Sequence, residues 1–183
     1  SIEERVRELM RDLERVLKEI REHSKRVIEE AKRVLEEIER NSERNNKELE
    51  EVLDEIRKRP VDETLVREVE EAVKKLKEHN KRSSDTVRDA VRKLVERLKE
   101  SSDRATELVK DLKRKLEEVL RRGGEKELEE RDHMVLHEYV NAAGITKEVV
   151  DRLKEVLERL KEHNRRSLDE SRKVLRELKE RIR

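Results

Sequence analysis

Two histidines stand four residues apart in this chain, at His133 and His137. On a helix this spacing places both imidazoles on one face, an arrangement that can hold zinc. A metalloprotease helix would carry glutamate directly after the first histidine, but that position is Met134. A protein zinc site also needs a third ligand, and none is in view. We therefore predict no metal, no cofactor and no catalytic residue here.

Histidine, asparagine and serine also recur where a helix would otherwise carry apolar residues. A nucleophilic site would need a carboxylate or a second histidine level with one of these rings, and none shares that position. We predict instead a buried hydrogen-bond network that determines helix register and pairing. Protonation of His79 or His163 would then make the layer acid-sensitive. The predicted network contains His23, Asn41, Asn45, His79, Asn80, Ser83, Ser101, Asn164, Ser167 and Ser171.

The composition argues against several functional classes. The chain has 49 basic and 48 acidic residues, a net charge of +1 and charges of alternating sign, so it has no field that would attract nucleic acid or an anionic membrane. Aromatic residues make up 1% of its 183 residues, which disfavours an enzyme pocket, and it has no cysteine. No apolar run approaches the roughly 20 residues of a membrane span. We expect a soluble protein without enzymatic activity.

Regular apolar spacing predicts the fold. From Ile2 to Ile56 apolar or small residues recur in steps of three and four that repeat every 18 residues, which is 3.6 residues per turn and indicates nearly straight helices. The same stripe continues in the second helix, where it includes Leu76. We predict three long helices at about 2–58, 62–121 and 125–182. They form an all-α, antiparallel up-down-up three-helix bundle, a single domain over residues 1–183. Such regularity indicates a designed sequence.

Local signals indicate where the helices begin and end. Ser1 and Glu4 match a capping box, Pro60 ends the first helix, Asp62 caps the second, and Gly123 and Gly124 end it. Because antiparallel helices rise equally per residue, facing residues of the first two helices should have numbers adding to about 121. Facing residues of the second and third helices should likewise have numbers adding to about 247. The two sums together bring the polar residues near 41–45, 79–83 and 163–171 to one level.

A second polar layer is expected to be incomplete. His23 and Ser24 of the first helix lie level with Ser101, Ser102 and Thr106 of the second. The facing part of the third helix offers only Asn141 and Thr146 as partners. We therefore expect unsatisfied hydrogen-bonding groups here.

One stretch of sixteen residues differs from the rest of the chain. It contains the only tyrosine, one of two methionines and two of five histidines. As a strand it would place Tyr139 and Ala142 on opposite faces, whereas as a helix it continues the apolar stripe in phase through Asp132, Val135 and Thr146. We predict that it is helical and buried. The stretch is Arg131, Asp132, His133, Met134, Val135, Leu136, His137, Glu138, Tyr139, Val140, Asn141, Ala142, Ala143, Gly144, Ile145 and Thr146.

Residues 131–146 resemble the last β-strand of the green fluorescent proteins, in the form used as a split-reporter tag. The surrounding chain resembles designed helical bundles with programmed hydrogen-bond networks, including cage-and-latch switches. The resemblance implies that the ten-strand fragment of such a fluorescent protein is the partner and forms the chromophore. It also implies that Glu138 matches the glutamate beside the chromophore, which assists its maturation and proton network.

Two functions follow as expectations from this resemblance. The first is a synthetic conformational switch or biosensor scaffold that holds the strand as a helix and releases it to the ten-strand fragment. A competing designed helical peptide would be a further partner. The alternative is an inert designed scaffold that tests helical burial of a strand sequence. In both cases we expect a monomer, no natural location, and a cytoplasmic protein when it is expressed in a bacterial host.

Overall fold

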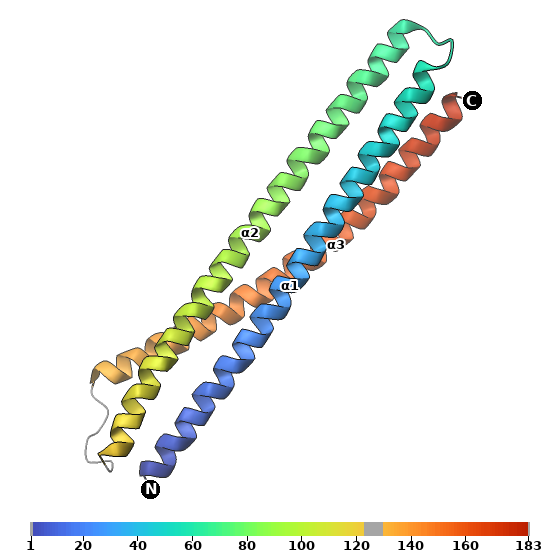
Figure 1. Ribbon diagram of the computed structural model, residues 1–183. Coiled ribbons are helices and arrows are strands. Elements are labelled where there is room, and N and C mark those ends of the chain that lie inside the picture. Colours follow the sequence, from blue (N-terminus) through green and yellow to red (C-terminus); the bar gives the residue numbers. More distant parts are fainter. Residues whose placement is uncertain (1, 123–129, 183) are drawn as a thin grey trace. The chain divides into compact units, whose positions relative to one another are not determined.

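The computed structural model describes residues 2–122 and 130–182, which form three helices (Figure 1). They are α1 (Ile2–Arg57), α2 (Glu63–Arg121) and α3 (Glu130–Ile182). The predicted all-α three-helix bundle is confirmed, and no strand occurs within those two described ranges. The predicted ends at Ser1, Gly123 and Gly124, and the predicted helical residues 125–129, lie outside them.

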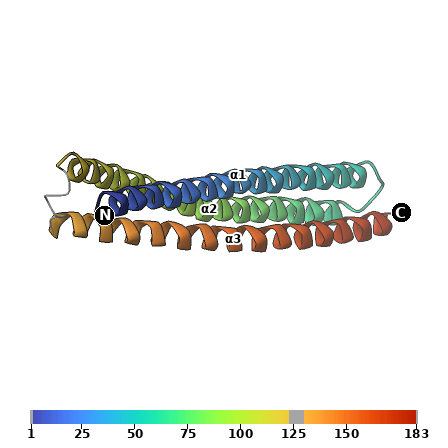
Figure 2. The ribbon, with the colours of Figure 1, turned by 90° about the horizontal axis from the view of Figure 1, so that it is seen from below.

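A short connection joins α1 to α2 (Figure 2), and its hydrogen bonds agree with the predicted helix ends. The Lys58 amide donates to the Asp54 carbonyl and the Arg59 amide to the Ile56 carbonyl, each at 3.2 Å, and Pro60 cannot donate the bond that would continue the helix. At the start of α2, the Thr64 amide donates to Asp62 Oδ1 at 3.3 Å. Asp62 therefore caps α2, as predicted, by satisfying one of its free N–H groups.

The chain divides into two compact units, and each contains a segment of every helix. Unit 1 comprises Ser1–Glu30 and Lys93–Glu155, and unit 2 comprises Ala31–Arg92 and Val156–Arg183. All three helices contribute to both units, so the units are not separate stretches of the chain. The single domain over residues 1–183 stays a prediction. Each unit is described by itself below.

The core of unit 1 is built from all three helices. α1 contributes Leu13, α2 contributes most of the leucines, and α3 contributes Tyr139 and Ala142. Each buried large side chain stabilises the fold by about 1.5–3 kcal/mol. The buried set is Leu13, Ala105, Leu108, Val109, Leu112, Leu116, Tyr139 and Ala142.

Unit 2 has a comparable core, in which α1 supplies most of the residues. Leu175 of α3 lies in the same cluster as four residues from the end of α1, so the C-terminal part of α3 packs beside that end (Figure 2). The buried set is Leu49, Val52, Leu53, Ile56, Val73 and Leu175. One predicted member of the stripe is wrong: Leu76 is 42% exposed.

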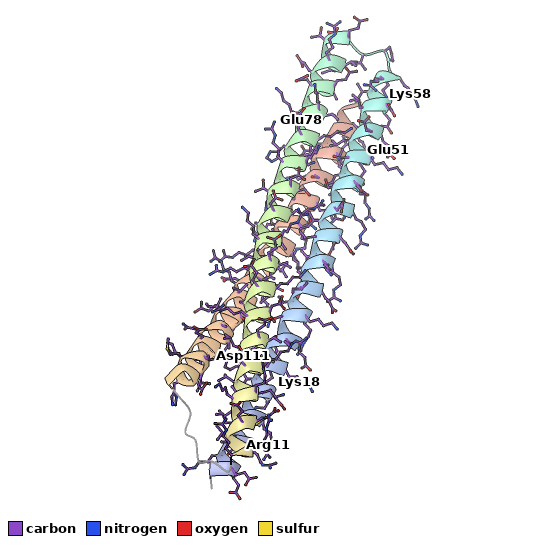
Figure 3. The ribbon with its side chains drawn as sticks, turned by 60° about the vertical axis from the view of Figure 1, so that its left-hand side comes forward. Arg11, Lys18, Glu51, Lys58, Glu78 and Asp111 are labelled. Atoms are coloured by element: carbon purple, nitrogen blue, oxygen red, sulfur yellow. The ribbon has the colours of Figure 1, made fainter. Side chains whose placement is uncertain are left out.

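Charged side chains cover the outer faces of both units. Exposed examples are Arg11, Lys18 and Asp111 of unit 1, and Glu51, Lys58 and Glu78 of unit 2 (Figure 3). Surface ion pairs between such residues contribute about 0–1 kcal/mol each, so they stabilise the bundle little. Their geometry is nevertheless informative about pairing.

Four ion pairs that join α1 to α2 have the same register. In unit 2 they are Arg57–Glu70 at 3.1 Å, Arg88–Glu39 at 3.3 Å and Lys77–Glu50. In unit 1, Lys113 pairs with Glu14 at 2.5 Å. The residue numbers in each of these pairs add to 127, and the three pairs of unit 2 establish its antiparallel arrangement. Part of the excess over the expected 121 arises because each side chain leans toward the N-terminus of its own helix.

The burial pattern predicts unequal effects for two leucines of α2. Leu98→Ala removes a side chain with 0% exposure and should lower the free energy of unfolding by about 2–5 kcal/mol. Leu76→Ala should change the free energy of unfolding by less than about 0.5 kcal/mol, because Leu76 is 42% exposed and lies at the surface. Urea unfolding followed by circular dichroism measures both, and equal losses would contradict this assignment of the core.

Candidate functional site

Residues 131–146 lie in the first turns of α3, as the phase of the stripe predicts. The exposed fractions of Asp132, Tyr139, Ala142 and Thr146 are 6%, 4%, 4% and 0%. Val135 is half-buried on the same face. This face continues beyond the segment through Val149 and Leu153, which are 4% and 0% exposed. The predicted helical conformation and its phase are both confirmed.

The segment packs on α1 and α2 within the core of unit 1. Tyr139 and Ala142 are members of the buried cluster that contains Leu108 and Leu112 of α2. Val135, Leu136 and Ala143 are partly buried against that cluster. The core-facing side of the segment therefore packs against both other helices.

The opposite side of the segment is unusually apolar for a surface. Met134, Val140 and Ile145 are 62%, 59% and 42% exposed. These three belong to a set of six large exposed hydrophobic residues in the described part of the chain, although the segment has only sixteen residues. Adjacent apolar residues, such as Val135 beside Met134 and Tyr139 beside Val140, cannot all lie on one side of a helix. The helix therefore leaves part of the segment's apolar surface exposed.

Two buried hydroxyl groups of unit 1 are not satisfied. Tyr139 Oη and Ser24 Oγ are enclosed and have no hydrogen-bond partner among the described residues. A buried unsatisfied group costs about 1–3 kcal/mol. Burial also raises the pKa of the Tyr139 phenol above 10.0, because desolvation disfavours the phenolate.

The second polar layer makes its hydrogen bonds within single helices. Ser101 Oγ donates to the Leu98 carbonyl at 3.1 Å, and Thr106 Oγ1 donates to the Ser102 carbonyl at 2.9 Å. Thr146 Oγ1 donates to the Ala142 carbonyl at 2.7 Å. The predicted incompleteness of this layer is confirmed by Ser24, but the prediction that His23 is buried is wrong because its side chain is exposed.

A charged residue of the segment also lies within the buried stripe. Asp132 lines a cavity of about 390 Å³ together with three basic and two acidic residues from the end of α2. They are Arg114, Lys115, Arg121, Asp111 and Glu118. Basic groups near a buried carboxylate offset part of the cost of its desolvation.

Glu138 forms a cross-helix ion pair on the surface of unit 1. Arg104 Nη2 of α2 donates to Glu138 Oε2 at 3.3 Å, and the two side chains are 65% and 48% exposed. An exposed pair of this kind contributes about 0–1 kcal/mol. It engages the carboxylate that the resemblance identifies with the reporter's glutamate.

The polar residues of unit 2 converge as predicted but do not form a buried network. All of them except Ser171 line an open cleft of about 340 Å³, in which His79, Ser83 and Ser167 are exposed. Asn41, Asn45, Asn80, Asn164 and Ser171 are half-buried, and no hydrogen bond joins any of these side chains within residues 2–122 and 130–182. Asparagine and serine are too short to fill the space between the helices, so they face a cleft that water can enter. The prediction of a buried network is therefore wrong.

The acid sensitivity expected of this layer loses its physical basis. His79 and His163 are both exposed and line the cleft without a hydrogen-bond partner in the described structure. Protonation of either ring therefore breaks no buried hydrogen bond. The sequence also missed Asn46, whose Oδ1 is enclosed without a partner among described residues. The sequence marked Asn46 only as a second asparagine directly after Asn45, which was itself predicted to be buried.

Neither a metal cluster of three or more ligands nor a membrane span occurs among the described residues. No cluster of three or more His, Cys, Asp or Glu side chains suited to a metal occurs within residues 2–122 and 130–182. Over the same residues, every helix is too polar to cross a bilayer. A comparison with protein-family models, curated proteins and solved structures finds no match to this chain.

The single tyrosine allows a direct test of the buried segment. The chain has one tyrosine and no tryptophan, so phenolate absorbance reports Tyr139 alone. The raised pKa means that folding favours the neutral phenol, so its contribution to stability is complete below pH 10.0 and is lost as pH rises through the folded pKa. We expect a titration midpoint above 10.0 in the folded chain that returns to about 10 in urea.

Tyr139→Phe serves as the matched control for this titration. It removes the unsatisfied hydroxyl and keeps the ring, so its free energy of unfolding should be equal to or above that of the parent. The alkaline loss of stability assigned to the phenol should be absent. An unshifted midpoint in the folded parent would show that residues 131–146 are not packed as described.

Proposed function

We propose that this chain is a synthetic conformational switch, which holds residues 131–146 as a helix and releases them as a β-strand. The strand completes a fluorescent protein that lacks its last strand. As a strand the segment carries apolar residues on both faces, and as a helix it is buried in phase with the rest of α3; together these observations carry the proposal. The ten-strand fragment supplies the chromophore.

The two conformations exclude each other for geometric reasons. In the helix Tyr139 and Ala142 share the buried face, whereas in a strand they point to opposite faces. Complementation therefore requires that the segment leaves the core of unit 1. The rate or extent of fluorescence then measures how strongly the bundle retains it.

The position of the segment favours a local release. It occupies the start of α3, so that opening from Glu130 toward Thr146 breaks no earlier turn of this helix. Beyond it, Val149, Val150 and Leu153 are at most 4% exposed and retain the rest of the helix. The unsatisfied Tyr139 hydroxyl and the exposed Met134 and Val140 weaken the part that must leave.

Mixing the full chain with the ten-strand fragment tests the proposal. We expect fluorescence to develop more slowly than with an isolated peptide of residues 131–146, because only the opened state binds. Mild denaturant should accelerate it by increasing the opened population. A signal as fast as that of the peptide would instead favour an exposed tag on an inert scaffold. No signal in denaturant would exclude the reporter function altogether.

Gly144→Ala distinguishes retention by the helix from any effect on the strand. Gly144 is exposed within the helix and an added Cβ would meet no atom within 4 Å, so alanine should stabilise the helix by about 1 kcal/mol. Complementation of the full chain should slow by about fivefold, as that energy implies. The same substitution in the isolated peptide is the matched control, and an equal slowing in both would contradict helical retention.

A further inference from the structure

The two tag histidines lie on the exposed side of α3. His133 and His137 are both exposed, and neither has a hydrogen bond or ion pair in the described part of the chain. Their four-residue spacing on a continuous helix brings their Cβ atoms to about 5–6 Å. Two neutral imidazoles with their Cβ atoms this close can both reach one zinc, nickel or copper ion. No third protein ligand joins them within the described residues, so water would complete the coordination.

The same two residues cannot bind one metal ion when the segment is a strand. Four residues of extended chain separate their Cβ atoms by about 13 Å. Two nitrogens on a tetrahedral zinc ion, each at about 2.1 Å, lie only about 3.4 Å apart. Imidazole side chains are too short to close that difference. Chelation is therefore specific to the helical state of residues 131–146.

We propose that His133 and His137 form a two-histidine site for a divalent transition metal that locks the segment in its helical state. This regulation rests on the proposed function. A ligand that binds one state alone lowers the population of the other by a factor of one plus the ligand concentration divided by Kd. At zinc concentrations tenfold above Kd, complementation should slow about 11-fold.

Binding itself is tested first, with zinc chloride and the full-length chain. His79 and His163 share the polar cleft of unit 2, so the measurements use a His79→Asn, His163→Asn background. Isothermal titration calorimetry at a pH where imidazole is neutral should detect one site. His137→Asn should abolish it, and so should His133→Asn. Undiminished binding in either variant, or equal affinity for the isolated 131–146 peptide, would overturn the proposal.

Coupling is tested next, by complementation with zinc. The expected slowing should be reversed by EDTA and absent in His137→Asn. Zinc added to the completed fluorescent complex controls for quenching. Zinc binding without slowing would refute the lock. If the fragment never produces a signal, the proposed function fails, yet the site still predicts a zinc-dependent rise in the melting temperature of the parent that His137→Asn lacks. A melting temperature that zinc leaves unchanged would then refute the site separately.

Discussion

The structure depends on burying one apolar stripe from each of three very polar helices. Charged residues form 53% of the chain and hydrophobic residues 32%, so an isolated helix of this composition has too little apolar surface to be stable. Each unit solves this by placing residues from α1, α2 and α3 in a shared core, such as Leu13, Leu112 and Tyr139 in unit 1. Surface ion pairs record the antiparallel register but contribute little energy.

Residues 131–146 satisfy this constraint only in part, because apolar residues lie on both sides of the helix. Tyr139 and Ala142 are buried at helical spacing, and the cost appears elsewhere, in the exposed Met134 and Val140 and in the unpartnered Tyr139 hydroxyl. A segment that only partly fits its surroundings is less stable than its neighbours. The proposed release requires this property, and it also requires that the adjoining residues around Leu153 remain packed.

The polar positions behave differently from the apolar ones because their interactions are directional. A valine or leucine gains from any close apolar surface, whereas an asparagine needs a partner at hydrogen-bond distance and angle. In unit 2 the short side chains of Asn41, Asn80 and Asn164 surround an open cleft instead of pairing. In unit 1 the Ser101 and Thr146 hydroxyls bond to carbonyls of their own helices.

The sequence by itself determined the number of helices, the Asp62 cap and the buried face of residues 131–146, because these follow from local periodicity and nearest-neighbour chemistry. Only the tertiary structure decided that Leu76 is exposed, that His79 and Ser83 line a cleft and that Asn46 Oδ1 has no partner among the described residues. Those outcomes depend on the distance between neighbouring helices and on their rotation, and the spacing of apolar residues in the sequence determines neither. Hydrogen bonds form only within a few tenths of an ångström of their ideal length.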